Sequence, residues 1–506
     1  MTGSTAGPVE GPYDPWETIP ERAEGQGAMI TPSPFVAPSP FAAPGRRAHQ
    51  AAPYDLLVRG GEVLDPSQGL RAVRDVAFAY GRVAAVVEPG AIDPKAARSV
   101  LDATGKLVTP GLVDLHAHVY VGGAELALPA DEVCAAGGCT TVVDAGTAGA
   151  NSMLGLYRLA HDAGQTRTRV YAFVHISSIG LVGHPHGESR DLTYLEPELA
   201  AQCLLRYPGF VLGVKVRQTA YIVGANGLEP LRRAIRAAAL ADAALADAAL
   251  AAPAPSPDVD QAAGAQGPAA LQSADERPAP ASGVARPAAA QNVQASARSG
   301  RRVPVMVHIG GAPASIGELL SLLRPGDIVT HCFTGNTNGV VDASGRVEEA
   351  CRQARARGVL FDVGHGSGSF AEPVARAAVE QGFWPDTIST DLHSGSVNEK
   401  AVDLPTTMSK FLSFGMPLEE VVARATVAPA QVINACLPAP AREPLLGTLQ
   451  AGAPGDAAIL EVQQGEFTFM DARRFRWTGR QRLVAVHTIL KGRPWGRPYP
   501  QPYLVP

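Results

Sequence analysis

Eight short apolar stretches, each long enough for one buried β-strand, constrain the fold of this 506-residue chain more than any other feature. The segments between them can hold helices. Mostly apolar strands that alternate with helices are typical of a parallel sheet covered by helices, and eight such units favour closure into a TIM-type (β/α)8 barrel of the α/β class. The stretches are 107–119, 140–146, 169–177, 210–216, 303–309, 327–333, 358–364 and 387–392.

Two β-rich pieces flank this central region. Residues 54–90 contain short β-type runs that GG, DPSQG and YG turns interrupt, and a similar texture returns at 447–463. Short strands separated by tight turns are typical of a small antiparallel sheet. We therefore expect a small β-sandwich domain built from both flanks, residues 53–106 and 440–500, beside a barrel of residues 107–439.

Two segments are too poor in large apolar residues to form a core. Residues 1–52 are rich in Pro and Ala and repeat a PSPF unit, and residues 251–300 form an Ala/Pro-rich insertion between the fourth and fifth strands. Such composition predicts disorder. The alternatives are a docking arm for the tail and an active-site lid for the insertion.

Composition argues against several classes of partner. The chain has 43 basic and 48 acidic residues and a net charge of −5, which favours neither nucleic acid nor an anionic membrane surface. No stretch of about 18 apolar residues predicts a membrane span. The six cysteines include no CxxC pair, and the first residues do not resemble a secretory signal, so we expect a cytoplasmic protein.

Ligand-type side chains lie at the carboxyl ends of the predicted strands, the face of a barrel where active sites form. His116 and His118 are two residues apart at the end of one strand, so both side chains point to the same side and can bind one metal ion. Lys215 interrupts the apolar run FVLGVKV. Burial lowers a lysine pKa, and a neutral amine can react with carbon dioxide to form a carbamate that bridges two cations. Taken alone, Lys215 would more often be a snorkelling or salt-bridged residue.

Three further strands contribute His308 in VMVHIGG, His331 in IVTHCFTG and Asp391 in TISTDLH. Each histidine alone would more often be a buried structural residue. The joint order HxH, Lys, His, His, Asp on strands one, four, five, six and eight instead predicts two divalent cations about 3.5–4 Å apart. These ligands suit zinc, although Mn²⁺ or Fe²⁺ would also accept them.

The same strings resemble the amidohydrolase superfamily. VTPGLVDLHAHVY with its HxH motif, the downstream lysine, the two histidines and STD carry this resemblance, which covers about residues 54–495 outside the insertion. ISSIGL, GVKVR, HIGG, HCFTGNTNG and STDLH are similar to its amidohydrolase/deacetylase metallohydrolase branch, a group related to the dihydroorotases.

The resemblance implies roles for the six residues. His116, His118 and Asp391 would hold the more buried metal, and His308 and His331 the more exposed one. Lys215, carboxylated by carbon dioxide, would bridge the two ions. Asp391 would take a proton from a bridging hydroxide as it attacks and deliver it to the leaving group, while the exposed metal polarises the scissile carbonyl.

Other polar residues near the same strand ends are candidates for substrate contact. Arg217 lies two residues after Lys215 and could clamp a substrate carboxylate, although a structural salt bridge is equally compatible with its position. Tyr120 could donate to the oxyanion. The full set is Tyr120, His175, His184, Arg217, His365 and His393.

The predicted function is hydrolysis of a small acyl amide or ester, as in N-acyl amino acid deacetylases and acyl hydroxy-acid esterases. A cyclic-amide hydrolase of the dihydroorotase or hydantoinase type would use the same metals and is the first alternative. A metal-free scaffold that lost its chemistry is a remote one, because none of the six ligand positions is missing. The resemblance also leaves a homo-oligomer open.

Overall fold

The computed structural model describes residues 52–162, 166–184, 186–251, 302–438 and 441–495. Almost all of the predicted tail and of the predicted insertion therefore lies outside the described residues.

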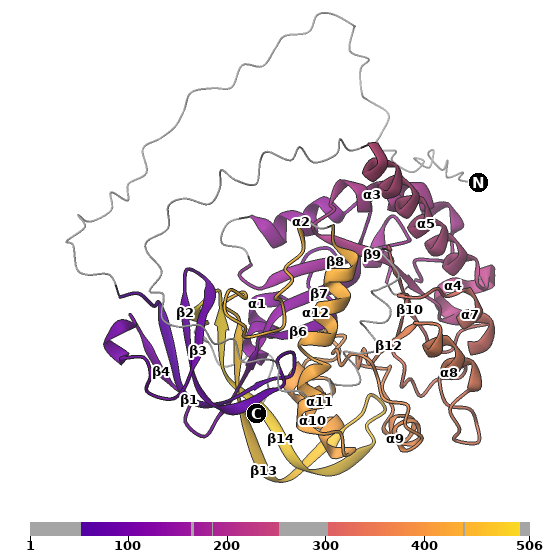
Figure 1. Cartoon of the computed structure of the whole chain (residues 1–506). Helices are drawn as coiled ribbons and strands as arrows, with labels where there is room; N and C mark the ends of the chain where they lie inside the picture. The colour runs from indigo at the N-terminus through magenta and orange to yellow at the C-terminus, as the bar shows by residue number, and fades with distance from the viewer. Residues whose placement is uncertain (1–51, 163–165, 185, 252–301, 439–440, 496–506) are drawn as a thin grey trace, which may run out of the picture. The chain divides into compact units, whose positions relative to one another are not determined.

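Seven parallel strands form the central sheet in the order β12-β11-β10-β9-β8-β7-β6 (Figure 1). Every residue of β7 and of β9 is buried, which is why these runs are mostly apolar and do not alternate with polar residues. The strands are β6 (Leu112–Ala117), β7 (Cys139–Gly149), β8 (Arg169–His175), β9 (Val211–Arg217), β10 (Val305–His308), β11 (Ile328–Thr330) and β12 (Leu360–Asp362).

The segment 387–392 closes this sheet. Its Thr387 bridges to Asp362 at the end of β12, and its Leu392 bridges to Ala117 at the end of β6, both in the parallel sense. The backbone N–H of His118 also donates to the Leu392 carbonyl at 2.9 Å. The eighth predicted unit thus completes the circle, and the (β/α)8 barrel expected from the sequence is confirmed.

Helices follow the strands and surround the barrel. They are α1 (Ala130–Val133), α2 (Met153–His161), α3 (Pro197–Arg206), α4 (Ala220–Val223), α5 (Glu229–Ala251), α7 (Ile316–Leu322), α8 (Glu349–Ala356), α9 (Glu372–Glu380), α10 (Leu404–Ser413), α11 (Leu418–Ala423) and α12 (Val427–Cys436). Within the described part of the chain, no helix combines the length and the apolar character needed to cross a bilayer.

Helix α12 closes the amino-terminal end of the barrel (Figure 1). Its Val432 and Ile433 belong to one buried apolar cluster with Val113, Phe173 and Met306 from the strands. These apolar side chains fill the barrel interior at that end. The carboxyl ends of the strands, where polar residues gather, are therefore the end that is left for chemistry.

Both flanks of the chain contribute to a second, mixed sheet, in the order β15-β14-β13-β5-β1-β2-β3 with β4 paired to β1. The strand β5 joins the two flanks, since it pairs in parallel with β1 and antiparallel with β13. The strands are β1 (Leu56–Asp65), β2 (Leu70–Ala79), β3 (Arg82–Val87), β4 (Val100–Asp102), β5 (Leu107–Pro110), β13 (Ala457–Met470), β14 (Arg476–Leu490) and β15 (Arg493–Trp495).

The stretch 107–119, read from the sequence as one strand, is two strands in two different sheets. The chain passes from β5 to β6 at Gly111. A Cβ atom at this position would lie 2.1 Å from Thr140 Oγ1, so only glycine lets the backbone pass so close to the neighbouring strand.

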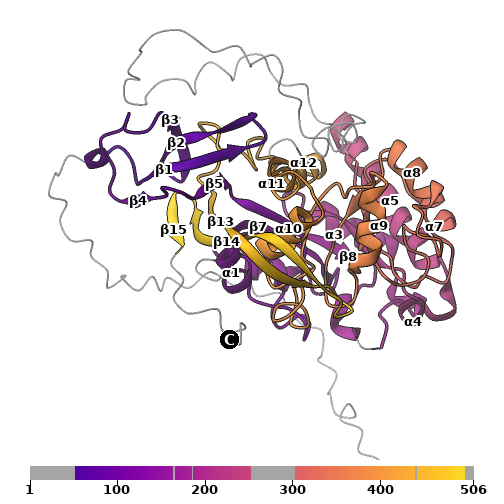
Figure 2. The same ribbon diagram turned by 90° about the horizontal axis from the view of Figure 1, so that it is seen from below.

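The long hairpin β13–β14 leaves its sheet and packs along α10 of the barrel (Figure 2). Trp477 Nε1 donates to Ser413 Oγ at 2.8 Å, and the Leu483 N–H donates to Ser409 Oγ at 2.8 Å. At the end of the hairpin, the buried Asp471 accepts the first N–H of α9, from Glu372, at 2.9 Å. The tip of the β domain is therefore anchored at the end of the barrel where the strands have their carboxyl ends.

Candidate metal centre

The six predicted ligands all belong to the carboxyl-terminal end of the barrel. His116 lies in β6, Lys215 in β9 and His308 at the last position of β10. His331 directly follows β11, and Asp391 lies in the closing segment. All six side chains line one pocket of about 460 Å³.

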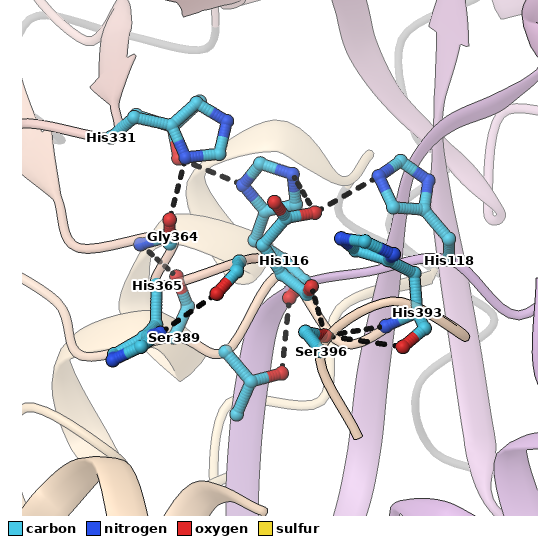
Figure 3. Close-up of polar contacts among 12 residues, drawn as sticks. His116, His118, His331, Gly364, His365, Ser389, His393 and Ser396 are labelled. Atoms are coloured by element: carbon cyan, nitrogen blue, oxygen red, sulfur yellow. Dashed lines mark hydrogen bonds and ion pairs between the residues drawn. The ribbon is translucent and has the colours of Figure 1, made fainter. Parts of the chain in front are cut away.

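Three of these side chains meet at Asp391. Its Oδ1 atom lies 3.1 Å from His118 Nε2 and 3.3 Å from His116 Nε2, and one ligand atom from each of the three residues falls within 4.8 Å of the others (Figure 3). Lys215 Nζ lies 3.2 Å from His116 Nε2. A carboxylate and two imidazoles therefore form one cluster, and the amine adjoins it through His116.

Hydrogen bonds fix the orientation of the first two imidazoles. His116 Nδ1 lies 2.7 Å from Thr330 Oγ1, and Thr330 Oγ1 donates to Asp362 Oδ2 at 2.8 Å. Since the threonine proton goes to Asp362, Thr330 accepts from His116, which places the proton of His116 on Nδ1. His118 Nδ1 is held in a similar way by Thr147 Oγ1 at 2.8 Å. Both Nε2 atoms are left to face the cluster, the arrangement that metal-bound histidines require.

The second pair of histidines lies beside the first. His331 Nδ1 donates to the Gly364 carbonyl at 2.5 Å, so its Nε2 is also free of a proton (Figure 3). The His331 ring centroid lies 4.1 Å from that of His308 and 5.0 Å from that of His116. The His331 ring thus lies close to both His308 and His116.

The backbone is unusual at two of these positions. His331 and Asp391 adopt φ angles of +67° and +47°, in the left-handed region that L-residues other than glycine rarely occupy. Backbone hydrogen bonds hold both turns, from Thr334 N to His331 O at 2.9 Å and from Asp391 N to His116 O at 2.6 Å. Strained backbone of this kind gathers at functional sites, where it aims a side chain.

Burial sets the protonation of the cluster. It lowers the pKa of His116 well below its usual value, and that of His331 to about 4, so both imidazoles are neutral. Burial also lowers the pKa of Lys215 to about 7. Burial alone would raise the pKa of Asp391, but the close contacts of its carboxylate with His116 and His118 hold that pKa well below its usual value. The group therefore presents neutral nitrogen donors and an ionised carboxylate.

This donor set fits divalent metal ions. Neutral imidazole Nε2 atoms and a carboxylate oxygen are the ligands that zinc and its neighbours prefer. The Nδ1 atoms of His116, His118 and His331 each contact a neighbouring oxygen, so their Nε2 atoms are turned toward the cluster.

Three of the six predicted substrate contacts line the pocket: His184, Arg217 and His393. His393 Nδ1 accepts the Gly395 N–H at 3.1 Å, and its ring faces that of His118 at 6.3 Å between centroids. The sequence reasoning did not name three other lining residues, Glu125, Tyr221 and Asn336. Glu125 and Asn336 lie on loops and Tyr221 lies in the short helix α4, and no periodicity in the sequence marked any of them.

Arg217 faces the pocket with two of its five N–H donors already used. Its Nε and Nη2 atoms each donate to Glu188, to Oε1 and Oε2, both at 2.7 Å. Burial alone would raise the pKa of Glu188, but Arg217 overrides it and holds that pKa far below its usual value. The guanidinium is thus fixed in direction by a structural salt bridge while it remains part of the pocket wall.

His175 lies behind this pair and not in the pocket. It is fully buried, and its Nδ1 accepts the Ser177 N–H at 2.9 Å. Its Nε2 therefore carries the proton and lies 3.2 Å from Glu188 Oε1. His175 supports Glu188, and through it Arg217.

Two further predicted contacts also lie outside the pocket. Tyr120 packs against α2, where its hydroxyl occupies the space beside Gly155. His365 is fully buried and stacks on Phe370 at 4.6 Å between centroids, and Figure 3 shows its ring directed away from His116 and His118. A strand period of two could not reveal either orientation, because both residues follow the ends of their strands.

Comparison with known proteins agrees with this architecture. A model of the amidohydrolase family matches residues 99–173. The chain is 32% identical to a deacetylase of Agrobacterium fabrum over 355 residues, which are 70% of this chain and 72% of the relative. It is 29% identical to a deacetylase of Enterococcus faecalis over 441 residues, which are 87% and 98% of the two chains.

Two solved structures are similar over 87% of this chain and 99% of their own. One is an adenine deaminase, with a TM-score of 0.68 and 28% identity, and the other is a dihydroorotase, with a TM-score of 0.67 and 27% identity. Since the relative from Agrobacterium fabrum exceeds 30% identity over most of both chains, this chain is a hydrolase that belongs to the amidohydrolase superfamily.

Proposed function

We propose that this protein is a binuclear metal-dependent deacylase that hydrolyses the acyl amide or acyl ester bond of a small molecule. One observation carries the proposal: Asp391, His116, His118 and Lys215 converge within hydrogen-bonding distance at the base of a pocket of about 460 Å³ that His308 and His331 also line. The two relatives named deacetylase support the acyl specificity.

The six residues would together bind two metal ions. His116, His118 and Asp391 would hold one ion, His308 and His331 the other, and Lys215 would serve both. Two divalent cations, when bound, supply the Lewis acidity that polarises a carbonyl and activates water for attack. Zinc suits these donors, and Mn²⁺ and Fe²⁺ remain compatible with them.

Lys215 would serve both ions as a carbamate. Its amine nitrogen would attack the carbon of carbon dioxide, so that an N–C bond forms, one C=O π bond opens to leave its electron pair on oxygen, and the nitrogen gives up a proton to solvent. The reaction needs the neutral amine, which a pKa of about 7 makes available near neutral pH. The product is an anion that carries two carboxylate oxygens on the lysine nitrogen.

Asp391 is the proton carrier. It is ionised, it lies at the meeting point of the cluster, and it also faces the pocket. Its free oxygen accepts a proton from the attacking water and returns that proton to the nitrogen or oxygen that leaves when the acyl bond breaks.

The pocket walls suggest how a substrate is oriented. Arg217 and His184 lie on the same wall as Tyr221, and Leu126 and Leu181 add apolar surface. Arg217 has its Nη1 amino group left over after Glu188 has taken two of its N–H donors. A substrate carboxylate would be placed there by a donor whose direction is already fixed.

Hydrolysis of a cyclic amide is the second candidate. The dihydroorotase of known structure favours it, because it is 27% identical and aligns over 87% of this chain. The two candidates differ in the bond that is broken, which lies outside a ring in one case and within a ring in the other.

A substrate panel separates the two candidates. The zinc-loaded protein is assayed with N-acetyl amino acids of both hands, O-acetyl hydroxy acids, hydantoins and dihydroorotate, with bicarbonate present. The proposal predicts release of acetate with the highest kcat/KM among the linear substrates. A preference for ring opening would replace the deacylase assignment with the second candidate.

A variant of the bridging residue tests the metal centre. Lys215→Ala should bind fewer than two metal ions per chain and lose about 1000-fold or more in kcat/KM, because the developing charge is then poorly stabilised. Lys106→Ala removes a lysine that pairs with Glu461 in the β domain, and it should keep both metal content and activity. A Lys215→Ala protein with two metals and full turnover would refute the bridge.

A further inference from the structure

A second fully buried lysine, Lys410, has no part in the metal centre. It lies on α10 with 1% of its surface exposed, and it ranks among the largest side chains that are completely enclosed in the described part of the chain. Removing an ammonium group from water is costly unless every N–H finds an acceptor. The hydrogen-bond acceptors around the Lys410 ammonium group therefore indicate the role of this residue.

Lys410 Nζ makes three hydrogen bonds, and each goes to a different segment. It donates to His365 Nε2 at 2.7 Å, to the Lys400 carbonyl at 2.6 Å and to the Met470 carbonyl at 2.8 Å. His365 follows β12, Lys400 follows the closing segment that carries Asp391, and Met470 ends β13. Three acceptors match the three N–H bonds of an ammonium group.

The contact to His365 has a defined direction. His365 Nδ1 lies 2.9 Å from the Gly366 carbonyl, which can only accept, so Nδ1 carries the proton and Nε2 accepts from Lys410. Burial and the adjacent Lys410 charge lower the pKa of His365 well below its usual value, so the imidazole is neutral. The two ring nitrogens of His365 therefore link the Lys410 ammonium group to the Gly366 carbonyl.

Gly366 is in close contact with Asp391. A Cβ atom added to Gly366 would lie 2.3 Å from Asp391 Oδ2, and the Gly366 N–H donates to the Thr390 carbonyl at 2.8 Å. Any shift of this residue therefore moves the carboxylate. Lys400 adds a second link between the same loops, because its Nζ donates to the Ser367 carbonyl at 2.6 Å.

We propose that Lys410 is a positioning residue for the hydrolytic reaction: it fixes the loops after the seventh and eighth strands, and through His365 and Gly366 it sets the placement of the Asp391 carboxylate. The inference rests on the proposed function only in so far as Asp391 is the proton carrier. In this proposal the Met470 carbonyl, which belongs to the β domain, also helps to position the active site because it accepts a hydrogen bond from Lys410.

The test compares Lys410→Met with a matched control, Trp477→Phe. Trp477 connects the same helix to the same hairpin through its bond to Ser413, and its ring faces Lys410 Nζ at 6.0 Å from the centroid, an aromatic face that phenylalanine keeps. Both variants are examined as metal-loaded full-length protein, below the temperature at which either begins to unfold. Activity is measured with whichever substrate of the panel the wild-type protein hydrolyses fastest, of either chemical class.

Lys410→Met should lower kcat by about 10- to 100-fold with a change in KM below about threefold, because the reacting group is misplaced while the substrate wall is intact. Metal content should stay at the wild-type value. Trp477→Phe should leave kcat within about twofold of the wild type. Loss of stability in both variants with no fall of kcat in Lys410→Met would overturn the proposal.

Two further measurements keep the idea testable if Lys410→Met folds poorly or if the deacylase assignment fails. His365→Ala should lower kcat to a similar extent, and the double variant with Lys410→Met should be no worse than either single one, whereas independent effects would multiply. Amide hydrogen exchange, which needs no substrate, should rise in segments 365–370 and 393–402 of Lys410→Met and not of Trp477→Phe. Unchanged exchange in these segments would contradict the proposal whatever the substrate is.

Discussion

The carboxylate of Glu188 meets the guanidinium of Arg217 edge to edge, with two N–H···O contacts of 2.7 Å. The pair lies where the substrate pocket meets the protein interior, because Arg217 lines the pocket while Glu188 is 3% exposed. A buried ion pair is costly to break from one side, since the charge that remains has no partner.

Replacement of Glu188 should therefore impair both stability and substrate binding. We expect Glu188→Leu to lower the free energy of unfolding by about 3 kcal/mol and to raise KM for carboxylate-bearing substrates. Urea denaturation and steady-state kinetics measure the two effects. The double variant Glu188→Leu/Arg217→Met should regain most of the stability and none of the affinity, and a double variant less stable than Glu188→Leu would contradict this account of the pair.

The hydroxyl of Thr330 should matter for metal affinity, although it touches no metal. Thr330→Val leaves His116 Nδ1 without its acceptor, and loss of such a support typically costs about 10- to 100-fold in metal affinity. Competition with a chromophoric chelator measures the dissociation constant. Thr407→Val is the control, because Thr407 is equally buried and bonds only to carbonyls near the start of α10. Equal metal affinity in the two variants would argue against the support.

The contact between Gly366 and Asp391 predicts a strong effect from a single methyl group. Gly366→Ala should displace the carboxylate and lower kcat/KM by about 100-fold, as a misplacement near 1 Å can. Gly382→Ala is a close control, since Gly382 has φ +75° and no atom within 4 Å of the added Cβ, whereas Gly366 has φ +57°. The control carries the backbone strain without the collision. Similar losses of activity in both variants would assign the effect to strain.

The pH dependence of stability should reveal Lys410. Its pKa is about 7 in the folded protein because of burial, which the carboxylates of Asp471 and Asp403 only partly offset, and about 10.4 in the unfolded chain. Between these values the unfolded chain binds one more proton, so stability rises with pH by up to about 1.4 kcal/mol per unit. The difference in unfolding free energy between the wild type and Lys410→Met should therefore grow from pH 7 to pH 10. A difference that is constant across this range would mean that Lys410 keeps its charge when folded.

The barrel and the residues of the candidate metal centre were accessible to sequence reasoning for a physical reason. Strands buried on both sides must be apolar, so His116, Lys215 and Asp391 stand out as polar exceptions at the ends of such runs. The structure brings these residues together. The same logic could have found Asp362, which is acidic within the apolar run GVLFDVG and which orients Thr330.

Other features depend on contacts that no local pattern encodes. Glu188 and Lys410 are charged residues in a loop and a helix, where charge is ordinary, and only the folded chain shows that both are buried. The direction of the His365 side chain could not be predicted either. Gly364 and Gly366, on either side of it, have left-handed backbone, which breaks the alternation of side chains that the strand would otherwise continue. The alternation of side chains that a sequence reveals ends with each strand, whereas the active-site residues lie at and after the strand ends.

The strand β5 has a consequence for how the protein is made. It joins β1 to β13 in one sheet, but β13 begins only at Ala457, after every strand of the barrel. A ribosome must therefore complete the whole catalytic barrel while one edge of β5 still lacks its neighbour. The edge of β5 is therefore covered only after the last strand of the barrel has been synthesised, so the β domain is completed later than the barrel.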